Sequence, residues 1–163
     1  MSDAPTTGAA ASGGRWFEDY AVGVAHALGT VTLDRASIVE FATRYDPQPF
    51  HVDDEAARAS PYGGLIASGW QTASVMMSVV ADGYLSPQSS LGSPGVDDVR
   101  WLRPVRPGDT LSVSATPIES TPSRSRPDRG LVRTRIEVRN AAGEPVMTMV
   151  AMNLIRRRPA AGA

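Results

Sequence analysis

Two groups that can carry protons stand close together in the segment 46–51, which reads Asp-Pro-Gln-Pro-Phe-His. Asp46 is a potential base, and His51 can exchange a proton near neutral pH. Fully extended, the segment would hold the two side chains more than ~10 Å apart, so they cooperate only if the chain curls. The prolines make a fixed curl reasonable, and we predict a stiff polar turn suited to proton transfer. The alternative is a turn-opening aspartate beside a structural histidine.

A second chemical feature lies at 66–70, which reads Ile-Ala-Ser-Gly-Trp and leads into a long apolar stretch. The backbone N–H groups at a helix N-terminus point outward and carry partial positive charge. Gly69 would let a ligand approach that backbone closely. We therefore predict an oxyanion hole for a carbonyl oxygen that gains negative charge. The alternative is a glycine that only shapes the entry into the helix.

Composition excludes several classes of chemistry. The chain has no cysteine, which rules out disulfides, thiolate metal sites and cysteine nucleophiles. All 16 basic residues are arginine, so Schiff-base and Walker-type lysines are excluded. A formal net charge of -1 favours neither nucleic acid nor an acidic membrane surface as a partner. The two histidines stand among scattered carboxylates without metal-ligand spacing, so we predict no metal and no cofactor.

The domain organisation is simple. Residues 1–14 are small and polar, without the basic start and apolar run of a secretory signal, and are expected to form a disordered tail. One domain is expected over 15–158, followed by a flexible C-terminus at 159–163. No stretch approaches the roughly 20 apolar residues that span a bilayer. The expected location is the cytoplasm.

Three helices are expected to position the chemical groups. Asp34 is a good N-cap for a helix that ends at Tyr45, because Pro47 pushes Asp46 out of the helical region. The segment 46–50 is therefore predicted to be extended or turned rather than helical. Asp53 is predicted to cap a short helix that runs through Arg58.

The longest helical candidate, 68–84, has apolar side chains around most of its circumference and no charge before Asp82, so we expect it to be buried. Alternating apolar residues predict strands, with a loop over 121–130 and a hairpin over 140–144. The predicted strands cover 22–33, 96–105, 111–118, 131–138 and 146–155. The fold class is α+β: a curved antiparallel sheet wrapped around a long central helix.

Two blocks of sequence resemble a known family. The first comprises the Phe-Ala pair at 41–42, the segment 46–53 and the segment 64–69, and the second is Val-Arg-Trp-Leu-Arg-Pro-Val-Arg-Pro-Gly-Asp-Thr-Leu at 99–111. Together they resemble the MaoC-like dehydratases, also called (R)-specific enoyl-CoA hydratases, from about Phe17 to Ile155. The resemblance implies a single hot dog fold. It also implies a homodimer or a dimer of dimers, with each active site near the subunit interface.

The resemblance implies a hydro-lyase of fatty acid metabolism that reversibly hydrates a trans-2-enoyl thioester, carried by coenzyme A or an acyl carrier protein. Asp46 and His51 match the catalytic pair that holds one water, and Gly69 matches the N–H donor to the thioester oxygen. The expected substrate-binding residues are Gln48, Phe50, Tyr62, Ser68 and Trp70. Three of these depart from the usual family pattern: Gln48 replaces Asn, Ser68 replaces His, and Trp70 replaces a smaller apolar residue.

Two other functions remain open for a chain with these residues. One is a hot dog domain that binds acyl thioesters without catalysis. The other is a hot dog thioesterase, which would release free thiol.

Overall fold

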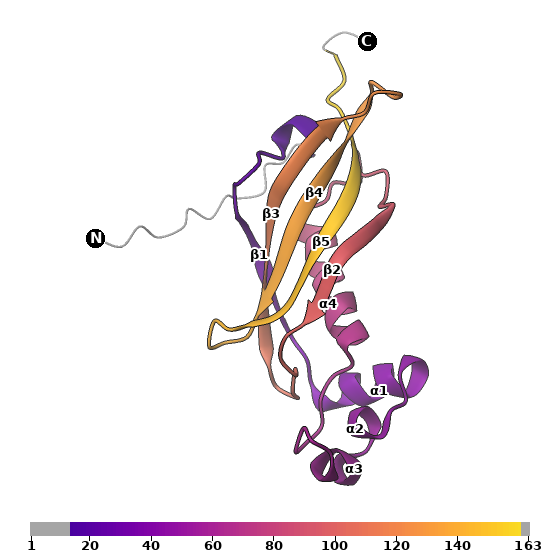
Figure 1. The fold of residues 1–163 in the computed structure, drawn as a ribbon, viewed down its shortest axis with the longest axis vertical. Coiled ribbons are helices and arrows are strands. Elements are labelled where there is room, and N and C mark those ends of the chain that lie inside the picture. The colour runs from indigo at the N-terminus through magenta and orange to yellow at the C-terminus, as the bar shows by residue number, and fades with distance from the viewer. Residues whose placement is uncertain (1–13, 161–163) are drawn as a thin grey trace, which may run out of the picture.

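Residues 14–160 are described by a computed structural model, in which five antiparallel strands form one sheet of order β1-β3-β4-β5-β2 (Figure 1). The predicted segments 1–14 and 159–163 fall largely outside this range. The strands are β1 (His26–Thr32), β2 (Gly95–Trp101), β3 (Thr110–Pro122), β4 (Arg129–Arg139) and β5 (Pro145–Arg156). The helices are η1 (Phe17–Asp19), α1 (Arg35–Tyr45), α2 (Pro49–Val52), α3 (Asp54–Ala59) and α4 (Gly69–Gly83).

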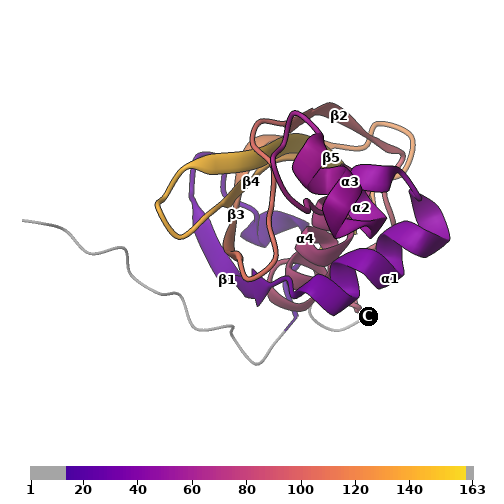
Figure 2. The same ribbon diagram turned by 90° about the horizontal axis from the view of Figure 1, so that it is seen from below.

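The sheet curves around α4, and α1, α2 and α3 gather across one end of it (Figure 2). The alternation in the sequence explains which face is covered. Leu111, Val113 and Ala115 of β3 are buried, and so are Val132 and its alternating neighbours on β4. The predicted α+β architecture, an antiparallel sheet around a central helix, is therefore confirmed.

The predicted burial of α4 around nearly its whole circumference is wrong. Met76 and Val80 are buried in the core. On the other side, the Trp70 side chain is 62% exposed and Met77 is 41% exposed. The sheet covers the helix from one side only, so apolar residues on the opposite side face outward in the single chain.

Strand limits also differ from the prediction. β1 begins at His26 rather than at residue 22, and β2 ends at Trp101 rather than at residue 105. β3 continues to Pro122, where it pairs with Gly130 of β4, so the connecting loop is shorter than predicted. A strand begins and ends where its hydrogen bonds to a neighbouring strand begin and end. The alternation of side chains along the sequence does not show where that pairing stops.

Both predicted caps are present: the Asp34 carboxylate accepts from the Ser37 N–H at 2.7 Å, and Asp53 accepts from the Ala56 N–H at 2.7 Å. The prediction that residues 46–50 avoid a helical turn is wrong at its end, because α2 begins at Pro49. Proline suits the first helical position, where its missing N–H has no helical partner to lose. The Asp53 N–H closes the turn on the Pro49 carbonyl at 2.9 Å.

In the described part of the chain, every helix is too short or too polar to cross a membrane.

Candidate active site

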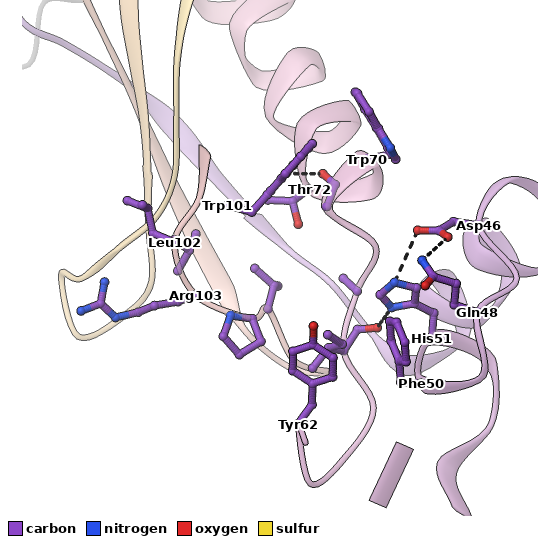
Figure 3. Close-up of a pocket in the computed structure, with 16 residues that line it drawn as sticks. Asp46, Gln48, Phe50, His51, Tyr62, Trp70, Thr72, Trp101, Leu102 and Arg103 are labelled. Carbon is purple, nitrogen blue, oxygen red and sulfur yellow. Dashed lines mark hydrogen bonds and ion pairs between the residues drawn. The ribbon is translucent and has the colours of Figure 1, made fainter. Parts of the chain in front are cut away.

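Asp46 and His51 meet at the end of the molecule where the short helices gather (Figure 3). Asp46 is the C-cap of α1, and His51 lies on α2. The His51 Nε2 atom is 3.4 Å from Asp46 Oδ2, in place of the wide separation of an extended chain. His51 is buried, whereas the Asp46 side chain is 19% exposed. The curl predicted from the two prolines is therefore present, with the α2 turn completing it.

The orientation of the His51 ring follows from its other nitrogen. Nδ1 lies 2.8 Å from the Ile66 carbonyl oxygen. A carbonyl can only accept a hydrogen bond, so Nδ1 carries the proton in the neutral ring. Nε2 then presents its lone pair on the side of Asp46. The Phe50 ring packs edge-on against the imidazole, with centroids 4.5 Å apart, and helps hold this orientation.

Each oxygen of the Asp46 carboxylate accepts one hydrogen bond from the protein. The Ser68 hydroxyl donates to Oδ2 at 2.7 Å, and the Gln48 side-chain amide donates to Oδ1 at 2.7 Å. The bond from Ser68 is the main reason that the pKa of Asp46 lies below its usual value, with smaller contributions from Gln48 and His51. Asp46 is therefore ionised at neutral pH and can accept a proton.

The N-terminus of α4 faces the same space. Ser68 is the N-cap, and its hydroxyl oxygen accepts from the Trp70 N–H at 3.2 Å. The Gly69 N–H belongs to the first helical residue and makes no hydrogen bond to another of residues 14–160. Gly69 also contacts the Trp101 indole, whose Nε1–H donates to the Gly69 carbonyl at 2.8 Å.

An open cavity of about 500 Å³ joins these groups. Every residue that the sequence predicts for the site lines it, with the exception of Ser68, which is fully buried behind the lining. Tyr62 lies opposite α4, with its hydroxyl directed into the cavity (Figure 3). The lining consists of Asp46, Gln48, Phe50, His51, Tyr62, Ile66, Ala67, Gly69, Trp70, Thr72, Trp101, Leu102, Arg103, Pro104, Val105 and Val146.

Sequence reasoning did not assign Trp101 or Thr72 to the site. Thr72 lies one turn after Gly69 on α4, so helical spacing was a usable signal for it. Trp101 stands in the second family-like block, but its contact with Gly69 depends on where β2 ends. Arg103 also lines the cavity, but its guanidinium group points away from the cavity and donates to the Pro145 carbonyl at 2.8 Å.

No cluster of three or more histidine, aspartate or glutamate side chains that could hold a metal ion occurs among residues 14–160. The second histidine, His26, lies far from the cavity on β1, beside the Tyr84 ring.

A family model for the MaoC like domain matches residues 19–140, most of the chain. The chain belongs to the MaoC-like domain family. It is 35% identical over 129 residues to a UPF0336 protein of Streptomyces avermitilis, covering 76% of this chain and 84% of that one. It is also 32% identical over 153 residues to the mesaconyl-CoA hydratase of Cereibacter sphaeroides, covering 91% of this chain but 43% of the hydratase. The relatives of this chain thus include a protein named for hydration of mesaconyl-CoA.

Solved structures of MaoC-like proteins share the fold. A MaoC-like dehydratase from Rhodospirillum rubrum superposes with a TM-score of 0.84 at 41% identity, covering 90% of this chain and all (100%) of that chain. A Mycobacterium tuberculosis protein described as having a double hotdog fold superposes with a TM-score of 0.70 at 20% identity, covering 90% of this chain and 45% of that chain. The predicted hot dog fold is confirmed.

Proposed function

We propose that this MaoC-like chain catalyses the reversible hydration of a trans-2-enoyl thioester, and equally the dehydration of the 3-hydroxyacyl thioester. One observation carries the proposal. A carboxylate and an imidazole lie 3.4 Å apart and share a cavity with Gly69, whose N–H at the start of α4 makes no hydrogen bond within residues 14–160. Hydration of an enoyl thioester needs both a base for water and a donor for the carbonyl oxygen.

The Gly69 N–H is the donor in this proposal. The β-carbon of an enoyl thioester becomes electrophilic when its carbonyl oxygen is stabilised as negative charge develops. The 15-residue helix α4 adds its dipole at that position. With the thioester oxygen at Gly69, the acyl chain extends along Trp70 and Tyr62 at the cavity wall.

Asp46 and His51 act on the water. Ionised Asp46 and the His51 Nε2 lone pair hold one water, and an O–H bond breaks as the water oxygen attacks the β-carbon. The electron pair of the double bond moves toward the thioester oxygen. The proton taken by the pair is then delivered to the α-carbon, so that the net change is addition of one water. Gln48 keeps the carboxylate turned toward the cavity.

The proposal includes coenzyme A as the carrier, a place in fatty acid metabolism and a cytoplasmic location. The likeness to mesaconyl-CoA hydratase supports an acyl-CoA substrate. It also makes branched and dicarboxylic enoyl-CoA thioesters part of the substrate panel.

We propose further that the chain works as a homodimer. Large apolar side chains are exposed on neighbouring parts of α4 and β2, and β2 is an edge strand. They are Trp70, Met77, Val96 and Trp101. Light scattering on the purified chain should give twice the monomer mass, and Val96→Glu should reduce it to the monomer mass. A monomeric unmodified chain would contradict this part of the proposal.

The activity test uses the purified chain with crotonyl-CoA and mesaconyl-CoA, followed by loss of the enoyl absorbance. Asp46→Asn and His51→Ala should each lower kcat/KM by about 10²–10⁴-fold, because each removes a group that transfers a proton. Ser78→Ala, on the exposed side of α4, is the matched control and should keep the unmodified rate. Circular dichroism would check that all variants remain folded.

The outcomes separate the competing functions. Release of free thiol would indicate a thioesterase. Binding of acyl-CoA without turnover would indicate a non-catalytic domain. Unchanged hydration rates in both the Asp46 and His51 variants would overturn the assignment of the catalytic pair.

A further inference from the structure

Ser68 lies at the junction between the base and the helix that carries Gly69. Its side chain is 0% exposed and does not line the cavity, so it makes no direct contact with the space available to a substrate. Its hydroxyl donates to Asp46 Oδ2 at 2.7 Å and accepts from the Trp70 N–H at 3.2 Å. The single hydroxyl proton is thus committed to Asp46, while the oxygen caps α4.

Capping alone does not explain this arrangement. A cap needs only an acceptor for a backbone N–H, and Asp or Asn serves as well as Ser. The Ser68 hydroxyl also donates a hydrogen bond, and its acceptor is the Asp46 carboxylate, 22 residues earlier in the chain. That carboxylate belongs to the end of α1, a separate element from α4.

We propose that Ser68 is a positioning residue for the hydration reaction: its hydroxyl holds the Asp46 carboxylate at a fixed place relative to the N–H of the adjacent Gly69. This inference rests on the proposed function and deepens it. The base acts on the water that attacks the β-carbon, and the donor acts on the carbonyl oxygen, two carbons away in the same substrate, so their spacing must be held closely. Ser68 links the two groups, because its hydroxyl binds Asp46 and its backbone is bonded directly to Gly69.

Two further observations agree with this role. Ser68 is the largest contributor to the lowered pKa of Asp46, so its hydroxyl stabilises the charged form of the base. Gln48 also donates to Asp46, but it is exposed and its hydrogen bond goes to the other carboxylate oxygen, Oδ1. Among residues 14–160, His51 is the one basic group within ion-pair distance of Asp46.

The test compares Ser68→Ala, Ser68→Gly and the control Ser78→Ala. Glycine is nearly as good an N-cap as serine, so Ser68→Gly removes the donor while sparing the cap, whereas Ser68→Ala removes both. Both Ser68 variants should lose about 10–100-fold in kcat on enoyl-CoA, since a misplaced base costs rate rather than binding. Ser78→Ala should keep the unmodified kcat.

The second readout needs no substrate. Carbon-13 NMR of the Asp46 carboxyl group, assigned with Asp46→Asn, should show its pKa rising in both Ser68 variants and unchanged in Ser78→Ala. The positioning role would be overturned if the pKa of Asp46 did not change in the Ser68 variants. It would also be overturned if Ser68→Gly kept the full kcat while Ser68→Ala lost it. Absence of hydration by the unmodified chain would instead overturn the proposed function, and the two failures are therefore distinguishable.

Discussion

The indole of Trp101 lies directly against Gly69. Its Nε1–H donates to the Gly69 carbonyl at 2.8 Å, and a Cβ built on Gly69 would lie 2.6 Å from Trp101 Cε2. The two residues come from the end of β2 and the start of α4, which are 32 positions apart. A side chain at position 69 would therefore have to displace the Trp101 indole, whereas glycine fits without displacing it.

Gly69→Ala should lower the free energy of unfolding by about 1–3 kcal/mol, because the added methyl group overpacks against the indole. Urea denaturation measures this change. In a Trp101→Ala background the same substitution should cost less, since the clash is gone. Strictly additive effects of the two substitutions would show that the indole does not restrict position 69.

The neutral form of the His51 ring should carry its proton on Nδ1 and not on Nε2, because Nδ1 faces the Ile66 carbonyl oxygen at 2.8 Å. Nitrogen-15 NMR of the labelled chain at neutral pH distinguishes the two tautomers, and His51→Ala assigns the signals. His26 serves as the internal comparison. A proton on Nε2 in the neutral ring would contradict the orientation described for the site.

Trp70→Ala should leave stability nearly unchanged and alter substrate preference. The Trp70 side chain is 62% exposed and packs edge-on against Trp101, with ring centroids 5.1 Å apart, at the wall of the cavity. Removing the indole enlarges the cavity at this wall, so KM should change most for thioesters with longer acyl chains. Steady-state kinetics on enoyl-CoA thioesters of increasing length check this. Ile118→Ala is the matched control, an exposed apolar residue on β3 that lies outside the lining. Equal changes for all chain lengths would contradict the assignment.

Tyr84→Phe should cost about 1 kcal/mol of stability, the value of one buried hydrogen bond. The Tyr84 hydroxyl lies 3.0 Å from Thr134 Oγ1, and burial raises the pKa of Tyr84 to about 12, so the phenol stays neutral. Thermal or urea unfolding measures the loss. Adding Thr134→Val should cost little more, because the unpaired hydroxyl is then removed as well. A second full loss would show that the two hydroxyls are not partners.

Local features of the fold could be read from the chain because their causes are local. The caps at Asp34 and Asp53 act within three residues of each helix start. The alternation of Leu111, Val113 and Ala115 follows from the pleat of a strand. The prolines around Gln48 restrict the backbone at their own positions and at the residue before each. Such constraints need no knowledge of the rest of the molecule.

In the candidate site, too, some features follow from local sequence and others from tertiary packing. Sequence by itself determined the residue types, the prolines that favour a curl between Asp46 and His51, and the existence of the long helix predicted over 68–84. Tertiary structure alone decided that the Ser68 hydroxyl faces Asp46, that Trp101 covers Gly69, and that one side of α4 stays uncovered. These contacts join residues 22 and 32 positions apart. Backbone preferences act over a few residues, whereas which distant side chains meet is decided by how the elements pack together.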